Sequence, residues 1–200
     1  MAVIDPMGLS GRESYALLTS LYIPRPIAFV GSCSLDGVYN CAPFSFSAGV
    51  SSRPPMLMVS IGDKRGGVKK DTLKNIEETG SFTINIVNED ILEAMHESSS
   101  PFPPEVSEFD KVGLTPSRST KIPAPGIVES PVTMEMETHK IIRLDEARVT
   151  LVLGTVLLFH IRDEVMRDGL VSAEALKPVG RLGKDAYVVV REERKLPPVG

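Results

Sequence analysis

The most unusual local composition of the chain lies between residues 60 and 75. A strand end is followed there by a glycine-containing loop with four basic residues and then by the start of a helix. Backbone N–H groups of such a loop and of a first helical turn point outward, and the helix dipole favours negative charge beside them. Lys69 or Lys70 can add a formal positive charge. We therefore predict a site for a phosphate monoester; a solvated basic turn before an ordinary capped helix is the alternative.

Five residues refine this prediction. We expect Asp71 or Thr72 to cap the helix, and a threonine hydroxyl can donate to a phosphate whereas an ionised aspartate cannot. Gly62 and Gly67 stand where a nucleotide-binding P-loop has its two glycines. Val68, however, occupies the position at which that motif requires lysine, so the sequence excludes a P-loop.

Two further segments offer related chemistry. In residues 40–47, small hydroxyl residues interrupt a strand at its exit, where exposed backbone amides can meet the polar edge of a ring. Arg25 lies between Pro24 and Pro26, and its guanidinium group matches phosphate geometry; a surface ion pair is the alternative. Ser60 lies in an apolar strand, where hydrogen bonding within the sheet would also explain it.

Common catalytic motifs are missing from the sequence. It contains no G-x-S-x-G, H-E-x-x-H, paired C-x-x-C or G-x-G-x-x-G pattern. His96, His139 and His160 lie on separate elements without ligand spacing, so we predict surface or packed histidines and no metal site. Glu135 and Glu137 are expected on the wet face of a strand. An enzyme built on this chain would need a cofactor that carries the reactivity.

The elements that position these groups are predicted to be mainly strands. Sixteen glycines and sixteen prolines indicate short elements joined by sharp turns. Strands are expected at 27–34, 38–44, 56–61, 82–87, 132–137, 149–161 and 187–190. Short helices are expected at 13–20, at 72–78, where Gly80 closes the helix, and at 90–96. This pattern favours a closed or nearly closed barrel, which leaves few unpaired strand edges.

The clearest turn signal is Asp36-Gly37 between the first two strands, which predicts a hairpin. If these two residues close the turn, Cys33 faces Asn40, and Cys41 lies on the other face of the sheet from Cys33. A disulfide between the cysteines is then geometrically poor, so we predict reduced thiols.

Residues 98–131 contain seven prolines and little periodicity. Several apolar residues could anchor this segment, so we expect a long ordered excursion that packs over a cleft or onto a second subunit, rather than a free linker. The apolar residues are Phe102, Val106, Phe109, Val112, Leu114 and Ile122.

The overall charge excludes some functions. Lysine and arginine number 22 against 26 acidic residues, a net charge of -4 that gives no reason to expect nucleic acid or an anionic membrane as partner. The longest apolar run, 151–161, is far shorter than the roughly 20 residues of a spanning helix. The first residues lack the pattern of a secretion signal, so a cytoplasmic location is expected.

Taken together, the motifs resemble the flavin reductase-like, FMN-binding split-barrel family, in particular its flavoredoxin-type branch. The resemblance covers nearly the whole chain, so residues 1–200 are expected to form one such domain. It implies a six-stranded Greek-key split barrel, a homodimer, and FMN near the subunit interface. The motifs are Pro24-Arg-Pro-Ile27, Asp36-Gly37, Asn40-x-Ala-Pro-Phe-Ser45, Pro54-Pro55, Lys70-Asp-Thr-x-x-Asn75, Asn85, Ser130-Pro131, Arg181-Leu-Gly183 and Tyr187.

The resemblance also implies roles for individual residues. One group meets the isoalloxazine ring, a second forms the neighbouring strand, and a third forms the phosphate end with a residue that supports the helix start. Lys184 replaces a second glycine and Met136 replaces a cysteine often present in the family, which leaves the roles of Arg181 and of that strand open. The groups are Ser45, Phe46 and Ser47; Ser60, Ile61 and Gly62; and Arg25, Lys70, Asp71 and Thr72 with Asn75.

The implied activity is an NAD(P)H-dependent oxidoreductase in which flavin N5 accepts a hydride from NADH or NADPH. Because no dinucleotide fingerprint is present, we expect the nicotinamide to bind weakly, under the proline-rich segment. Three alternatives stay open: an FMN carrier that exchanges electrons with a redox protein partner, a split barrel for another phosphorylated cofactor such as pyridoxal phosphate or a deazaflavin, and a purely structural barrel.

Overall fold

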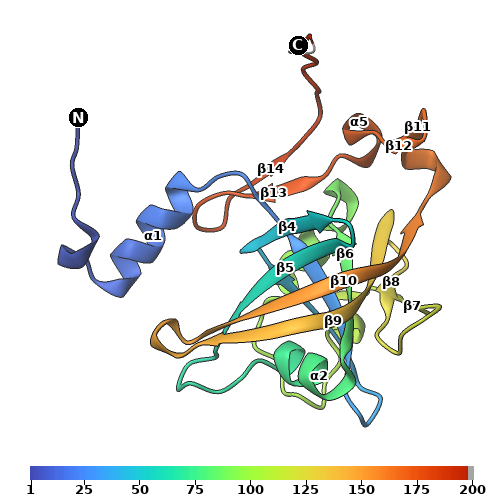
Figure 1. The fold of residues 1–200 in the computed structure, drawn as a ribbon, viewed down its shortest axis with the longest axis horizontal. Helices are drawn as coiled ribbons and strands as arrows, with labels where there is room; N and C mark the ends of the chain where they lie inside the picture. Colours follow the sequence, from blue (N-terminus) through green and yellow to red (C-terminus); the bar gives the residue numbers. More distant parts are fainter. Residues whose placement is uncertain (198–200) are drawn as a thin grey trace.

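The computed structural model describes residues 1–197 and is mainly β. One antiparallel sheet, with the strand order β3-β2-β6-β9-β10-β5-β4, curls into a split barrel (Figure 1). The main sheet of the described part has seven strands rather than the six expected. They are β2 (Ala28–Cys33), β3 (Tyr39–Phe44), β4 (Ser47–Ser52), β5 (Pro55–Gly62), β6 (Ser81–Ile86), β9 (Val132–Leu144) and β10 (Val149–Ile161).

The curl of the sheet follows from the connection between its two edges. β3 and β4 lie at opposite ends of the strand order, yet only Ser45 and Phe46 separate them in the chain. The three Cα–Cα steps from Phe44 to Ser47 span at most about 11 Å, so the edge strands must come together where this connection lies. The barrel therefore closes at Ser45 and Phe46.

The remaining strands form small sheets outside the barrel. β1 (Arg25–Pro26), β13 (Val179–Arg181) and β14 (Tyr187–Val189) make the largest of these, which lies above the barrel in Figure 1. The other two are hairpins: β7 (Pro116–Ser117) with β8 (Gly126–Ile127), and β11 (Met166–Arg167) with β12 (Leu170–Val171).

The helices are short. α1 projects from the barrel (Figure 1), and Thr19 is its one buried residue. α2, in contrast, packs Leu73 and Ile76 into the barrel core. Gly80, with a φ of 69°, ends α2, as the sequence predicts. The α-helices are α1 (Gly11–Leu21), α2 (Asp71–Thr79), α3 (Leu92–Glu97), α4 (Glu108–Val112) and α5 (Ala173–Leu176); the 3-10 turns are Pro6–Gly8, Glu89–Ile91, Asp145–Ala147 and Asp163–Val165.

The β2–β3 hairpin differs from the prediction by one residue. Ser34 N donates to Val38 O over 3.0 Å and Gly37 N donates to Ser34 O over 3.0 Å, so three residues close the turn rather than two. Gly37 has a φ of 83°, which completes a type I turn followed by a left-handed residue. The predicted pairing of Cys33 with Asn40 is therefore wrong.

The corrected register changes the relation between the two cysteines. Cys33 faces Tyr39 and Gly31 faces Cys41, so both cysteines lie on the same face of the sheet. The prediction that they lie on opposite faces is wrong. Both are nevertheless free, buried thiols, in agreement with the expectation of no disulfide.

Residues 98–131 are ordered and contribute to a second apolar cluster on the other side of β2. Phe109 of α4 and Leu114 are buried there beside Phe29, together with residues of α3. The segment contains α4 and the β7–β8 hairpin. The chain after β6 therefore covers this face of the barrel instead of leaving it open to water.

This covering also explains the burial of Glu135. The prediction that Glu135 lies on the wet face of its strand is wrong, whereas Glu137 is exposed as expected. Glu135 is fully buried and accepts hydrogen bonds from Thr120 N (2.6 Å) and Lys121 N (2.7 Å), while His160 Nε2 lies 2.6 Å from its carboxylate. Burial by itself raises the pKa of Glu135, but these donors together lower it below its usual value.

Candidate functional site

The segment expected to meet the ring and the strand expected beside it lie next to each other. Ser60 N donates to Phe46 O over 2.8 Å, and Ser47 faces Val59 in the β4–β5 ladder. Ser45, Phe46 and Ser47 are half-buried. The closure of the barrel therefore presents hydroxyl groups at the point where two strands meet.

Within the neighbouring strand, only part of the predicted group can face a ligand with its side chain. Ile61 is fully buried in the barrel core, so its side chain is a packing residue. Gly62 ends β5, and a Cβ atom placed there would meet nothing within 4 Å. Space is therefore open beside Gly62, where the chain enters the basic loop.

Arg25 is buried, with 2% of its surface exposed, and its guanidinium group is already bound to protein atoms. Nη1 donates to the carbonyl oxygens of Thr19 (2.6 Å) and Tyr22 (2.8 Å), and Nη2 donates to that of Leu182 (2.8 Å). These bonds tie the end of α1 to the loop after β13. The alternative of a surface ion pair is wrong.

Arg25 also supports the segment that closes the barrel. Its Nε donates to Ser45 Oγ over 3.4 Å, and its guanidinium carbon lies 5.7 Å from the centre of the Phe46 ring. None of its hydrogen bonds reaches Lys70 or Thr72. The structure thus brings Arg25 to the predicted ring end of the site and not to the phosphate end.

At the predicted phosphate end, α2 begins without a side-chain cap within residues 1–197. Lys70 is the N-cap residue, and no side chain among residues 1–197 caps the first turn. Asp71 is engaged by Lys64 at 2.6 Å, and the Thr72 hydroxyl donates to Asn40 Oδ1 at 2.8 Å. The prediction that Asp71 or Thr72 caps the helix is wrong, because both side chains are held by other partners.

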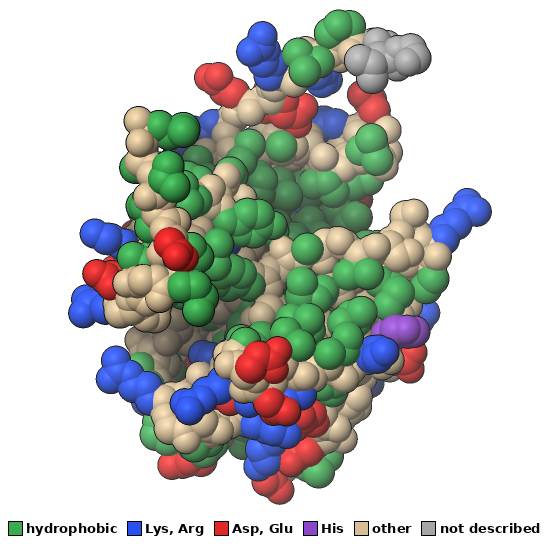
Figure 2. All heavy atoms as spheres, turned by 60° about the vertical axis from the view of Figure 1, so that its left-hand side comes forward, with side chains coloured by type: hydrophobic (Ala, Val, Ile, Leu, Met, Phe, Trp, Pro, Cys, Tyr) green, Lys and Arg blue, Asp and Glu red, His purple; other side chains and the backbone are tan. Residues whose placement is uncertain are grey.

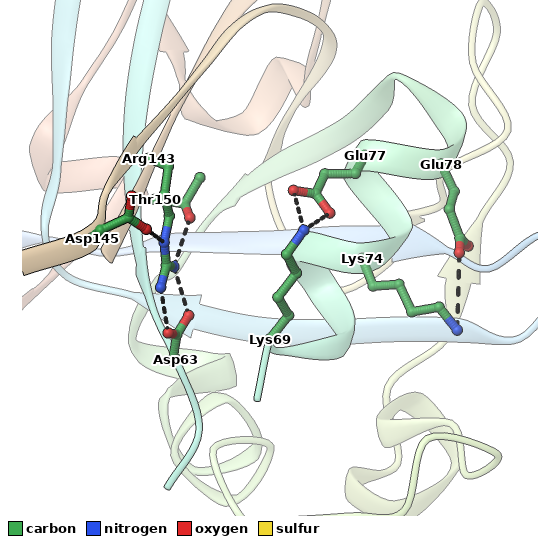
Figure 3. A network of polar contacts seen from close by, with 8 residues as sticks. All are labelled: Asp63, Lys69, Lys74, Glu77, Glu78, Arg143, Asp145 and Thr150. Carbon is green, nitrogen blue, oxygen red and sulfur yellow. Dashed lines mark hydrogen bonds and ion pairs between the residues drawn. The ribbon is translucent and has the colours of Figure 1, made fainter. Parts of the chain in front are cut away.

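Lys70 is the loop lysine that keeps its charge available. Lys64 pairs with Asp71, and Lys69 pairs with both carboxylate oxygens of Glu77 at 2.6 and 2.8 Å (Figure 3). Lys70 Nζ lies 5.8 Å from the centre of the Phe44 ring, and no ion pair of Lys70 occurs within residues 1–197.

Lys70, Asp71 and Thr72 line a common cavity of about 180 Å³, which we call the Lys70 cavity. The uncapped start of α2 forms one wall, and the first residues of the 98–131 segment form another. A cavity of this kind combines backbone donors with one free cation. Its other lining residues are Asn40, Ala42, Pro43, Lys64, Ser98, Ser99, Ser100, Pro101, Phe102 and Glu108.

A network beside the basic loop fixes its starting point. Arg143 on β9 donates to both oxygens of Asp63 at 2.8 and 2.6 Å and to Asp145 at 3.1 Å, and it also reaches Thr150 at 3.2 Å (Figure 3). The hydrogen bonds from Arg143 lower the pKa of Asp63. The β9–β10 hairpin therefore anchors the loop that leads from Gly62 to α2.

Asn75 supports α2, but not at the helix start. Its Nδ2 donates to Ser32 Oγ over 3.1 Å, which joins the buried face of α2 to β2. Ser32 Oγ in turn donates to Asn40 Oδ1 over 3.2 Å. Asn75 therefore fixes the distance between the helix and the sheet, and it does not line the Lys70 cavity.

Two residues of this region were not predicted. Asn40 belongs to the quoted Asn-x-Ala-Pro-Phe motif, yet its type alone did not indicate that it would bind Thr72. No local sequence pattern indicates a role for Glu108, because its partner Asn40 is 68 positions away in the chain. Only the packing of the 98–131 segment against β3 brings them together.

A second, larger hollow lies away from the Lys70 cavity. It measures about 610 Å³, is almost entirely apolar, and separates the small β1–β13–β14 sheet from the ends of β9 and β10. Figure 2 shows hydrophobic side chains gathered around a hollow on this face. Arg25, Ile27, Met134, Phe159 and Val179 are among its lining residues.

Comparison with known proteins identifies relatives with this fold. Residues 20–176 match the family described as "Flavin reductase like domain". Nitrilotriacetate monooxygenase component B from Bacillus cereus is 36% identical, with a TM-score of 0.93 and 98% of each chain covered. The 2-nitrobenzoate 2-nitroreductase NbaA of Pseudomonas fluorescens is 32% identical, with a TM-score of 0.90, over 99% of this chain and 96% of that one.

The flavoredoxin of Desulfovibrio vulgaris (Miyazaki F) shares the fold at lower identity. It is 23% identical with a TM-score of 0.77, over 87% of this chain and 91% of that one. The resemblance inferred from the sequence motifs is confirmed at the level of the family. Among residues 1–197, no helix is long and apolar enough to cross a membrane.

Proposed function

The chain belongs to the flavin reductase-like domain family, and we propose that it binds FMN and acts as an oxidoreductase of the flavin reductase type, with NADH or NADPH as electron donor. The observation that carries the proposal is the Lys70 cavity. It combines an uncapped helix start with a lysine that has no ion partner within residues 1–197.

The residues of the cavity fit one phosphate monoester. In the described part of the chain the first N–H groups of α2 have no side-chain acceptor, and Lys70 adds a positive charge beside them. Lys64 and Lys69 are already neutralised by acidic partners, so the cavity does not offer the several free cations that a more highly charged ligand would need. We assign the phosphate of FMN to Lys70 and the start of α2.

The ring end is assigned to the closure of the barrel. Ser45, Phe46 and Ser47 lie beside Ser60 and the open space at Gly62, and Arg25 holds Ser45 and Phe46 in place. When bound there, the flavin would supply the redox chemistry, accepting electrons as a hydride. The task of these residues is to bind and orient the ring, since no general acid or base is required of them.

We further propose that the protein acts as a homodimer with the cofactor near the subunit interface. α1 buries only Thr19 against its own chain, and Tyr15, Leu18 and Leu21 on it are exposed. The apolar hollow of about 610 Å³ offers a surface of matching character. A second copy of the chain that covers both would remove this apolar area from water.

A spectroscopic experiment tests the proposed function. The purified protein is reconstituted with FMN, gel-filtered, and then treated anaerobically with NADH or NADPH while the visible spectrum is recorded. Retained yellow colour that bleaches with a nicotinamide supports a reductase. Colour that persists until dithionite is added supports an FMN carrier that serves a protein partner. Colour lost on the column refutes tight FMN binding and favours another phosphorylated cofactor.

A further inference from the structure

A chain of three hydrogen-bonded side chains connects the Lys70 cavity to a buried carboxyl group. Thr72 Oγ1 donates to Asn40 Oδ1 over 2.8 Å, and Asn40 Nδ2 donates to Glu108 Oε1 over 2.8 Å. All three residues are buried, with at most 8% of their surface exposed. Water therefore cannot easily replace either link, and the direction of one hydrogen bond determines the direction of the next.

The carboxyl group at the end of this chain lacks a second partner. Oε2 of Glu108 is buried and makes no hydrogen bond within residues 1–197. Burial has the largest effect on the pKa of Glu108 and raises it, and the negative charge of Asp71 adds to this. Hydrogen bonds from the backbone of Glu108 and Cys41 and from Asn40 act in the opposite direction, but the net change in pKa is upward. The group therefore holds a proton at higher pH than an exposed glutamate does.

No base compensates for the burial of Glu108, since it forms no ion pair in the described part of the chain. Acidic and basic side chains line the two cavities beside Glu108, but none of them pairs with it in the described part of the chain. The Cys41 thiol on β3 is also close, and its pKa is raised by burial and by the charge of Glu108. The charged and titratable neighbours are Lys64, Lys70 and Asp71 in the Lys70 cavity, and Asp36, Tyr39, Asp71, Lys74 and Glu105 in the adjoining cavity.

The direction of the chain limits what Thr72 can do. As long as Asn40 gives its N–H to Glu108, its amide oxygen accepts hydrogen bonds from Ser32 Oγ at 3.2 Å and from Thr72 Oγ1 at 2.8 Å, and the single hydroxyl proton of Thr72 is used in the second of these bonds. Thr72 then offers only lone pairs to the cavity and cannot donate to a phosphate. Ionised Glu108 enforces this arrangement, because a carboxylate can only accept.

A protonated Glu108 permits the opposite arrangement. Its O–H can donate to the oxygen of a turned Asn40 amide, whose N–H groups then face Thr72 and Ser32. Thr72 becomes the acceptor of that bond, and its own proton is free for a ligand in the Lys70 cavity. The same three side chains thus deliver a donor to the cavity only when Glu108 carries a proton.

We propose that Glu108 is a positioning residue for the phosphate end of the site, whose protonated form lets Thr72 donate a hydrogen bond to a phosphate monoester and whose ionised form withholds that donor. This inference rests on the proposed binding of FMN. It predicts that discrimination between FMN and riboflavin, which lacks the phosphate, depends on the protonation of Glu108.

The test compares dissociation constants of FMN and riboflavin for the wild type and Glu108→Gln between about pH 5.5 and about pH 9. The glutamine side chain can donate or accept a hydrogen bond at any pH, whereas Glu108 loses its proton as the pH rises. The FMN affinity of the wild type is therefore expected to fall about tenfold relative to the FMN affinity of Glu108→Gln. Riboflavin affinity should show no such difference. The second ionisation of the phosphate, near about pH 6, affects both proteins equally. Glu105→Gln is the matched control and should follow the wild type.

A second variant guards against a folding defect of Glu108→Gln. Thr72→Val keeps the shape of the side chain without its hydroxyl, so it should bind FMN weakly at every pH and lose the wild-type pH dependence. Equal pH profiles for the wild type and Glu108→Gln, or an unchanged profile in Thr72→Val, would refute this inference alone. Absence of FMN binding at every pH would refute the proposed function, and this inference with it.

Discussion

Arg25 and Lys70 show how two cations with the same predicted role can differ in what they do. The guanidinium group of Arg25 is buried and donates to three backbone carbonyls, whereas Lys70 has no ion partner within residues 1–197 and lines a cavity. A cation whose hydrogen bonds are all made inside the fold stabilises that fold. A cation without such partners is free for a ligand, so the partners of a charged residue decide its role.

The largest effect is expected from Arg25→Met, which removes the donors and leaves the carbonyls of Thr19, Tyr22 and Leu182 without partners. We expect a loss of about 3 kcal/mol in the free energy of unfolding. In a chain of this size, this lowers the thermal midpoint by roughly 6–12 °C. FMN and riboflavin affinities should fall together. A normal midpoint with a selective loss of FMN would place Arg25 at the phosphate after all.

Lys70→Ala should weaken FMN binding selectively and leave the thermal midpoint unchanged, in contrast to Arg25→Met. Loss of a charge-assisted contact to phosphate is expected to weaken FMN about 30-fold, or about 2 kcal/mol, with riboflavin nearly unaffected. The thermal midpoint should hardly change, because Lys70 makes no ion pair in the described residues. Lys69→Ala is the control, since Lys69 is already paired with Glu77. Equal losses for both ligands would contradict the assignment.

A bulky residue at Ser47 tests the ring end of the site. Ser47→Trp is expected to weaken FMN and riboflavin equally, by about tenfold, because the ring is common to both ligands. Val50→Trp, at an exposed position of the same strand, serves as the control for damage to β4. Affinity and flavin spectrum identical to those of the wild type would remove Ser47 from the site.

The smallest effect concerns the anchor of the basic loop. The pKa of Asp63 is lowered in the folded protein by Arg143, so its stabilising contribution is present above the unfolded value of about 3.9 and is lost as the pH falls below it. Asp63→Asn should lower the thermal midpoint slightly at pH 7 and should flatten its decline in acid. An acid profile identical to that of the wild type would show that the Arg143 pair contributes nothing.

Many elements of the fold were predictable because their signals are local. Alternating and apolar runs located β5, β6 and β10, and Gly80 marked the end of α2. The hairpin signal at Asp36-Gly37 was equally clear, but it located the turn without determining whether two or three residues close it. That choice depends on hydrogen bonds of Ser34, which the composition of the turn does not reveal.

The candidate site also combines features that local sequence indicates with features that depend on residues far apart in the chain. The basic loop before α2 and the hydroxyl-rich exit of β3 were visible in the sequence, and the structure brings Ser45–Ser47 beside Ser60 and brings Lys70 beside Thr72. The burial of Glu135 was not visible, because the backbone donors that cover it come from residues 120 and 121.

The sequence by itself thus located six of the seven main-sheet strands in the described part of the chain, all but β4, together with the basic loop and the family of the chain, since turn residues, alternation and charge act over a few neighbouring positions. Only the tertiary structure decided which cation is free, because the partners of Arg25, Lys64 and Lys69 had first to be placed. It also decided that Thr72 is linked through Asn40 to Glu108. Hydrogen bonds between residues far apart in the chain depend on packing, and no local pattern records them.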